Sequence, residues 1–194
     1  RSQVAREGIT CVTCHRIQEE FTKVNGERTI VPGDIHAPVG GTMRDSVFDK
    51  VLERKDELRL ATSDGERGQK IHAGVYKFEQ LGESEFCVSC HQVAVNLGIK
   101  LEVVWDQYRD SPAHANGVTC QDCHMGKVPG VAAGYETAPS AIVNGEEINP
   151  GRRHSNHAFH GPGYPIAHPG IFPHNVDAAR WSIQEWLKFN YRAA

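Results

Sequence analysis

The stretch Cys11–His15, CVTCH, sets a pattern that the chain uses three times. The same spacing of two cysteines and a histidine returns in CVSCH at residues 87–91 and in CQDCH at residues 120–124. These copies account for all six cysteines of the 194-residue chain. The chemistry of this motif therefore decides how the rest of the sequence is interpreted.

CxxCH is the attachment motif of c-type haem. Each cysteine sulfur forms a thioether with a haem vinyl group, and the histidine supplies one axial nitrogen to the iron. The two residues between the cysteines form a tight turn, so both sulfurs reach neighbouring pyrrole edges and the imidazole is directed under the metal. We therefore predict three covalent haem c groups with their iron, attached at Cys11, Cys14, Cys87, Cys90, Cys120 and Cys123, with His15, His91 and His124 as proximal ligands.

Zinc, disulfides and a thioredoxin-type dithiol are the competing interpretations of these cysteines. A zinc ribbon favours CxxC pairs about 15 to 20 residues apart. The intervals here are 73 residues from Cys14 to Cys87 and 30 residues from Cys90 to Cys120. Histidine would follow all three CxxC pairs by chance with a probability of about 2 in 10,000. Haem is therefore the favoured interpretation.

Composition agrees with a core that is built around a cofactor. Hydrophobic residues make up 39% of the chain, which also holds 19 glycines and 10 prolines, so three large apolar macrocycles would supply much of the missing core. No apolar run approaches the roughly 18 residues of a transmembrane helix. The net charge of −3 argues against nucleic acid as a partner.

Haem is normally attached covalently outside the cytoplasmic membrane, which predicts a periplasmic, extracellular or cell-surface protein. The sequence shows no signal peptide and starts at Arg1 in a polar stretch. We therefore expect either the mature form or a piece of a longer chain.

Local patterns predict short elements separated by loops. The shared Gly-[Ile/Val]-Thr before the first and third motifs indicates a repeated module. The expected elements are a hairpin that turns at Asn25–Gly26, an amphipathic helix over 43–60, helices through the second motif and through 101–111, a long irregular loop over 126–173, and a helix over 175–191.

Three segments carry a resemblance to a known family: SEFCVSCH at 84–91, VVWDQYRDSPAH at 103–114 and GVTCQDCHM at 117–125. With them the chain resembles the multihaem cytochrome c superfamily, which includes the tetrahaem cytochrome of ammonia oxidisers, hydroxylamine oxidoreductase and pentahaem nitrite reductase. The resemblance implies a mainly α fold with extensive loops, small hairpins and a haem-centred core. It also implies closely stacked haems with bis-histidine iron, in a single trihaem domain over residues 1–194.

Each iron needs a ligand on its second face, and the chain offers several histidines for this role. His72 and His157 match positions of the family pattern, His36 lies in a DIHAP loop that Pro38 stiffens, and His114 lies at the SPAH position. These four are the candidate distal ligands. The histidines that compete are His36, His72, His114, His154, His157, His160, His168 and His174.

Three functions stay open from the sequence. The favoured one is electron transfer between redox partner proteins, which needs no catalytic residue. The second is the same chemistry in an oligomer, as a subunit of a redox complex or of a haem-wire filament. The third is an oxidoreductase of the nitrite or hydroxylamine type, with one open haem iron.

Overall fold

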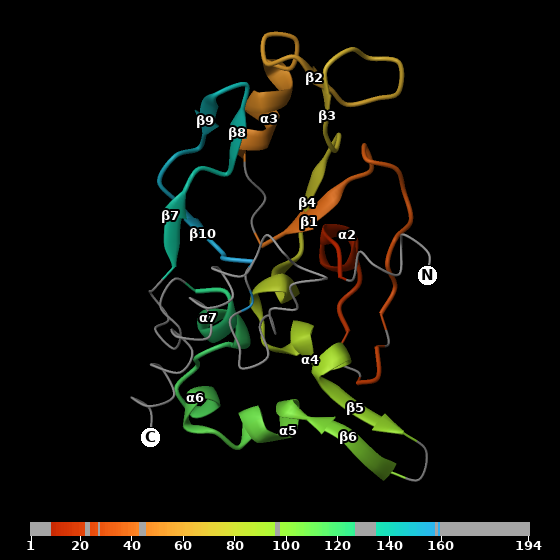
Figure 1. Ribbon diagram of the computed structural model, residues 1–194, viewed down its shortest axis with the longest axis vertical. Helices are drawn as coiled ribbons and strands as arrows, with labels where there is room; N and C mark the ends of the chain where they lie inside the picture. Colours follow the sequence, from red (N-terminus) through yellow and green to blue (C-terminus); the bar gives the residue numbers. More distant parts are fainter. Residues whose placement is uncertain are drawn as a thin grey trace, which may run out of the picture. The chain divides into compact units, whose positions relative to one another are not determined.

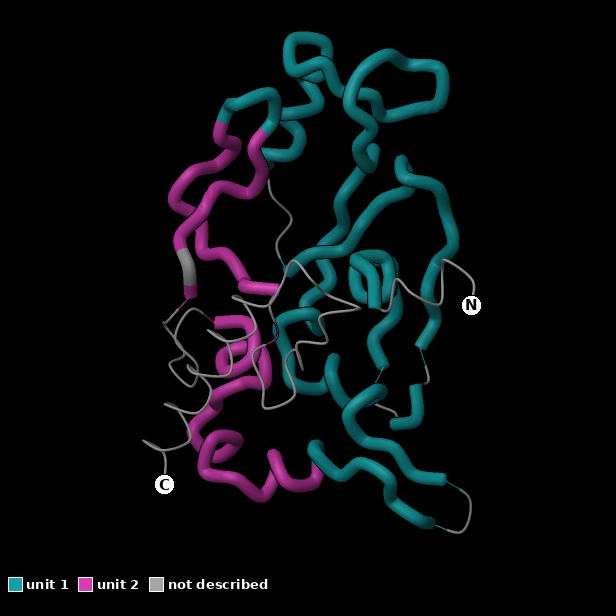
Figure 2. Tube along the Cα trace, in the orientation of Figure 1, with its two compact units in different colours: residues 1–105, 143–146 teal, residues 106–142, 147–194 magenta. Residues whose placement is uncertain are grey.

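The computed structural model describes residues 9–21, 24–26, 28–42, 46–95, 98–126, 135–157 and 159. The chain divides into two compact units (Figure 2). Unit 1 comprises residues 1–105 and 143–146, and unit 2 comprises residues 106–142 and 147–194. The first and second CxxCH motifs belong to unit 1, and the third belongs to unit 2.

Short helices and strands alternate through unit 1 (Figure 1). The helices are α2 (Cys11–His15), α3 (Ser46–Glu53), the 3₁₀ turn η1 (Glu79–Gly82) and α4 (Glu85–His91). The strands are β1 (Val39–Gly41), β2 (Leu60–Ala61), β3 (Gln69–Lys70), β4 (Val75–Lys77), β5 (Gln92–Val95) and β6 (Ile99–Val103).

The strands of unit 1 pair two by two. Strands β1 and β4 run parallel with Gly40 opposite Tyr76, and β2 runs parallel to β3 with Leu60 opposite Gln69. Strands β5 and β6 form an antiparallel pair with a bulge between Val93 and Ala94. These small sheets bring segments that are far apart in sequence next to the first and second motifs.

A small aromatic cluster forms the core between those two motifs. Buried Ile17, Phe21, Phe78 and Phe86 pack together, and Cys14 of the first motif packs against them. The Phe21 and Phe86 ring centroids lie 5.6 Å apart. Phe86 belongs to α4, so the helices of both motifs share this core.

Unit 2 begins within α5 (Val104–Arg109) and continues through α6 (Pro112–Ala115) and α7 (Cys120–His124). Strands β7 (Glu136–Ala138) and β10 (Arg152–His154) pair antiparallel. Between them in sequence lie β8 (Ala141–Val143) and β9 (Glu146–Ile148), which pair with each other.

Several local predictions are confirmed. Helix α4 runs through the second motif. The predicted turn is present at Asn25 and Gly26, which both have a positive φ, 63° and 75°. The described residues beside that turn form an isolated Ile17–Ile30 bridge rather than a longer ladder.

Three predicted boundaries are wrong. The helix expected over 43–60 ends at Glu53, because the Arg54 and Lys55 N–H groups bond only three residues back, to the Val51 and Leu52 oxygens, and the chain then enters β2 at Leu60. The first part of the helix expected over 101–111 is strand, because it pairs with β5. The loop expected over 126–173 contains β7 to β10 within its described part. The helix expected over 175–191 lies outside the described residues.

Of the residues that the structure describes, about 30% are in helices and 24% in strands of small two-stranded sheets, so no fold class is clearly shown. The mainly α, haem-centred class stays a prediction. Across the described ranges, no helix combines the length and the apolar character that a membrane crossing requires.

Candidate haem sites

The histidine of the first motif is held by a backbone carbonyl. His15 ends α2, and its Nδ1 lies 2.6 Å from the Gly40 oxygen. A hydrogen bond of this kind fixes the imidazole tautomer and makes Nε2 the nitrogen for a metal. Glycine at position 40 gives the Tyr76 ring its place, because a Cβ there would come within 2.8 Å of that ring and would force it to shift.

Tyr76 braces the chain that follows the motif. Its hydroxyl donates to the carbonyl oxygens of His15, at 3.1 Å, and Ile17, at 2.8 Å. Strand β4, which carries Tyr76, pairs with β1, which carries Gly40. One parallel strand pair therefore orients the ring of His15 and anchors its main chain.

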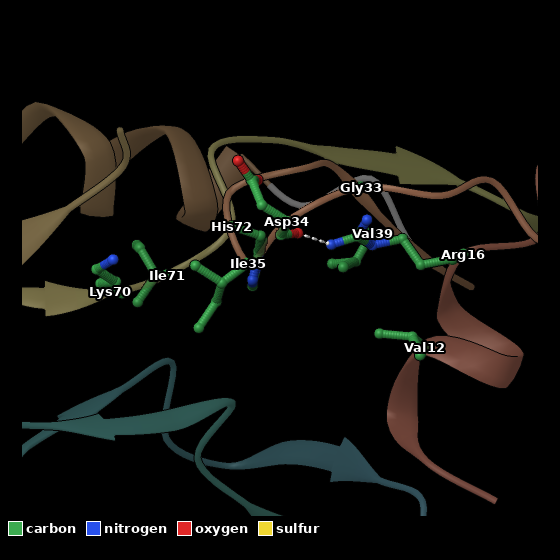
Figure 3. A pocket seen from close by; sticks show the side chains of 9 residues that line it. All are labelled: Val12, Arg16, Gly33, Asp34, Ile35, Val39, Lys70, Ile71 and His72. Carbon is green, nitrogen blue, oxygen red and sulfur yellow. Dashed lines mark hydrogen bonds between the residues drawn. The ribbon is translucent and has the colours of Figure 1, made fainter. Parts of the chain in front are cut away.

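A cavity of about 500 Å³ adjoins the first motif (Figure 3). Its volume lies within the range of about 300 to 1,000 Å³ that is typical of ligand sites. The lining residues come from α2, the loop before β1 and the segment after β3. They are Val12, Arg16, Gly33, Asp34, Ile35, Val39, Lys70, Ile71 and His72.

His72 is a half-buried side chain in the wall of this cavity. Its ring stacks on Phe48 of α3, with centroids 5.0 Å apart and planes 9° from parallel. Burial lowers the pKa of His72, and the positive charges of Arg16 and His15 lower it further. A neutral imidazole is the form that binds iron, so the surroundings of His72 favour a ligand.

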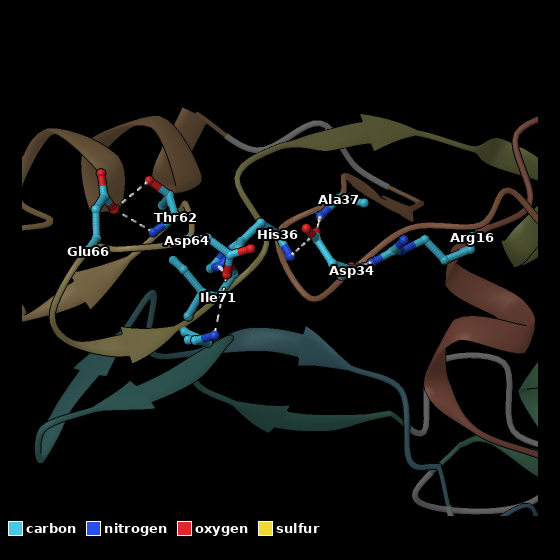
Figure 4. Close-up of polar contacts among 9 residues, drawn as sticks. Arg16, Asp34, His36, Ala37, Thr62, Asp64, Glu66 and Ile71 are labelled. Carbon is cyan, nitrogen blue, oxygen red and sulfur yellow. Dashed lines mark hydrogen bonds and ion pairs between the residues drawn. The ribbon is translucent and has the colours of Figure 1, made fainter. Parts of the chain in front are cut away.

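His36 lies near the same cavity but does not line it. It is buried, and its Nδ1 lies 2.8 Å from the Ile71 oxygen. Its buried Nε2 has no hydrogen-bond partner among the described residues and lies 3.7 Å from Asp64 Oδ1 (Figure 4). Asp34 Oδ1 accepts from the backbone N–H of His36 at 2.8 Å, which fixes the loop.

The histidine of the second motif bonds to a carboxylate. His91 ends α4, and its Nδ1 lies 2.9 Å from Glu102 Oε1 on β6. The β5–β6 hairpin brings Glu102 back to this position. A carboxylate behind a ligating histidine makes the imidazole more basic and fixes its orientation.

The first two motifs adjoin each other. The pKa of the Cys14 thiol is raised by burial, lowered by Arg28, and raised by Cys90 and Cys11. The Arg28 guanidinium also donates to Cys90 Sγ. Cysteines of different motifs therefore share one electrostatic environment within unit 1.

The third motif lies in a capped helix of unit 2. Thr119 Oγ1 accepts from the Asp122 backbone N–H at 3.1 Å, and the Asp122 carboxylate accepts from the Thr119 N–H at 2.9 Å. Tyr135 donates to the same carboxylate at 2.7 Å. At the other end of α7, the Asn156 N–H donates to the Met125 oxygen at 2.7 Å.

The remaining distal candidates belong to unit 2. His114 is exposed on α6 and meets the Tyr108 ring edge-on, at 5.2 Å between centroids. His157 is exposed, with Nδ1 2.9 Å from the Ser155 oxygen. Near it, at 6.4 Å between ring centroids, lies His154, whose buried Nδ1 has no hydrogen-bond partner in the described part of the chain. His160, His168 and His174 lie outside the described residues.

The donor sets of the two units fit haem c. Unit 1 contains two CxxCH motifs with candidates His36 and His72, and unit 2 contains one motif with candidates His114 and His157. The six cysteines form no disulfide with one another. No group of three or more histidine, cysteine or acidic side chains gathers around one point in the described part of the chain.

Sequence reasoning missed three residues that shape these sites. Arg16 follows the first motif directly, and its position beside the motif was a usable signal. Gly40 had no local signal, because β1 is held near His15 by pairing with the distant strand β4. Glu102 reaches His91 through the β5–β6 hairpin that directly follows the second motif, 11 residues along the chain.

Comparisons of the chain with protein-family models, with curated proteins and with solved structures found no match. The assignment of the haem sites therefore depends on the motifs and on the residues that surround them.

Proposed function

We propose that this chain holds three haem c groups and transfers single electrons between redox partner proteins. The observation that carries the proposal is the set of three CxxCH motifs, each placed on a short helix that ends at its histidine. When bound, each haem would supply an iron centre that gains and loses one electron. Covalent attachment makes a periplasmic, extracellular or cell-surface location part of this proposal.

At the first motif, the chain provides a preformed site. Gly40 and Tyr76 hold His15 from one side, and the adjoining cavity gives room for a large apolar group. His72 lies in the cavity wall, where burial lowers its pKa. We propose His72 as the distal ligand of this haem, because it lines the cavity and His36 does not.

At the second motif, the Glu102 carboxylate contacts Nδ1 of the motif histidine, as the Gly40 carbonyl does at the first. A carboxylate acceptor increases the negative character of the imidazole and stabilises the oxidised iron more than a carbonyl does. The two motifs of unit 1 would therefore have different reduction potentials. Because Cys14 and Cys90 adjoin, electrons would pass between two unequal sites that lie close together.

At the third motif, the chain orders the attachment helix and leaves its distal ligand to be chosen among neighbouring histidines. The capping box fixes the start of α7, and the bond from Asn156 fixes the residue that follows His124. His114 and His157 are the proposed distal candidates for this site.

An oligomeric form of the same function is favoured by one observation. On the β5–β6 hairpin, Val95, Ile99 and Leu101 are exposed by 42%, 56% and 67%. Clustered exposed apolar side chains mark interaction surfaces in soluble proteins. The two-stranded sheet also has outer edges that a strand of another chain can extend. We propose that this hairpin contacts a second copy of the chain.

The test of the proposed function is electron paramagnetic resonance of the oxidised, haem-loaded protein, before and after addition of nitrite. Electron transfer predicts low-spin signals that nitrite leaves unchanged, because every iron has two protein ligands. A high-spin signal that shifts with nitrite would overturn the carrier and indicate an enzyme with an open iron.

A further inference from the structure

Arg16 is a buried guanidinium in the wall of the first cavity. It directly follows His15, and its residue is only 4% exposed. In Figure 3, the Arg16 side chain lies along the same cavity as His72 and Ile35. A charged side chain is rarely buried to this extent unless an opposite charge compensates it.

The residues that the structure describes satisfy this guanidinium only in part. Arg16 donates one hydrogen bond from Nη2 to the backbone oxygen of Asp34 (Figure 4). Its Nε is buried and has no hydrogen-bond partner. Among the described residues, no carboxylate forms an ion pair with it.

The acidic side chain that lines the cavity forms its hydrogen bonds within its own loop. Asp34 also lines the cavity, yet its Oδ1 accepts from the backbone N–H groups of His36, at 2.8 Å, and Ala37, at 3.1 Å. Asp34 thus offers Arg16 its carbonyl, while its carboxylate caps the turn. The guanidinium therefore has no carboxylate partner among the residues that the structure describes.

The space around the guanidinium is itself shaped by the sequence. Gly33 lies beside it, and a Cβ at that position would come within 2.6 Å of Arg16 Nη1 and 2.5 Å of the Ala37 Cβ. A side chain at position 33 would therefore push the guanidinium out of its place. The burial of Arg16, its unpaired Nε and the space that Gly33 leaves beside Nη1 together indicate a site for an anion.

We propose that Arg16 binds a propionate carboxylate of the haem attached at Cys11 and Cys14. The inference rests on the proposed function, because haem is the molecule that would bring carboxylates into this cavity. Guanidinium and carboxylate groups pair through two parallel hydrogen bonds, and Nε with one Nη is a suitable donor pair. Arg16 is then a positioning residue that sets the orientation and potential of the first haem.

The positive charge of Arg16 should raise the reduction potential of the first haem. A positive charge near the haem favours the reduced form, because reduction adds an electron to the site. Removing this charge also leaves the propionate uncompensated, which favours the oxidised form further. The reduction potential of one haem should therefore fall when Arg16 is made neutral.

The experiment is a redox titration of the haem-loaded full chain, followed optically and resolved into three components. Arg16→Gln should lower the reduction potential of one component and leave those of the other two unchanged. Arg16→Lys, which keeps the positive charge, should have a potential close to that of the wild type for this component. Arg67→Gln is the matched control, because Arg67 is an exposed arginine of the same unit. It should move none of the three components.

Resonance Raman spectroscopy and the mass of the wild-type chain complete the test. Resonance Raman spectra of the wild-type protein and Arg16→Lys should differ in a haem propionate bending mode, which tests the contact even where Arg16→Gln does not load haem. Three haems with unchanged potentials in Arg16→Gln, or unchanged propionate modes in Arg16→Lys, would overturn the Arg16 assignment alone. A wild-type chain whose mass contains no haem would overturn the proposed function and this inference with it.

Discussion

Two motif histidines of this chain have the same role but different acceptors. His15 bonds to the carbonyl of Gly40 and His91 bonds to the carboxylate of Glu102. In both, Nδ1 makes the bond, so Nε2 is the nitrogen left for iron in the proposed haem sites. The difference lies in charge, and charge behind an axial ligand is one of the ways in which a protein sets a haem potential.

Glu102→Gln tests this difference. The glutamine oxygen still accepts from His91 but has no negative charge, so the potential of one haem should rise while its spin state stays low. Spectroelectrochemistry of the haem-loaded protein measures the shift, with exposed Glu53→Gln on α3 as the control for charge alone. Equal potentials in the wild type and Glu102→Gln would contradict the role given to Glu102.

His72 and His36 provide a second test at the scale of single residues. His72→Ala should convert one of three irons from low spin to high spin, because the ring in the cavity wall is lost. His36→Gln should leave all irons low-spin and act on stability alone, since His36 lies outside the lining. The absence of a high-spin iron in His72→Ala would contradict His72 as the distal ligand. A high-spin iron in His36→Gln would assign a ligand role to His36.

At the scale of elements, the first and third motifs are built alike. Each occupies a five-residue helix after an extended threonine, Thr10 in one case and Thr119 in the other. Their N-caps differ, because Thr119 takes part in a capping box with Asp122 and Thr10 makes no side-chain cap hydrogen bond. The repeated Gly-[Ile/Val]-Thr sequence thus corresponds to a repeated local structure.

The two threonines form a matched pair of variants. Thr119→Ala should lower the free energy of unfolding by about 1 kcal/mol, because it removes the cap of α7. Thr10→Ala should have a smaller effect, since no cap hydrogen bond is lost. Denaturant unfolding, followed by circular dichroism, measures both, and an equal loss in the two variants would argue against the capping box as the cause.

Element prediction succeeded where the signal was local and failed where pairing decided the outcome. The helix at the second motif and the turn at Asn25–Gly26 follow from neighbouring residues. The strand Ile99–Val103 depends on β5, whose pairing overrides a helical pattern. The β8–β9 hairpin had a local signal in Asn144 and Gly145, both with positive φ, which the many glycines and prolines of that region obscured.

At the scale of the whole molecule, the sequence predicts candidate attachment residues, and their surroundings became visible only in the fold. The cavity at the first motif joins residues 12–16, 33–39 and 70–72, and Tyr76 reaches Ile17 across 59 positions. Contacts over such separations have no signature in local pattern. For that reason the sequence predicted His72 as a candidate and missed Arg16 as its neighbour.

Association should depend on the β5–β6 hairpin. Leu101→Lys places a charge in the exposed apolar cluster and should lower the fraction of dimer in sedimentation velocity of the haem-loaded protein. Ile142→Lys is the control, because Ile142 on β8 is 64% exposed, close to the 67% of Leu101. Unchanged sedimentation in Leu101→Lys would assign the contact to another surface.

The central claim is covalent attachment of haem at all three motifs. Mass spectrometry of the denatured full chain, produced in cells with the c-type haem maturation machinery, tests it most directly. We predict a mass that exceeds the polypeptide by three haem groups, and one haem fewer in each variant whose motif cysteines are replaced by alanine. A mass equal to that of the bare polypeptide would contradict the account.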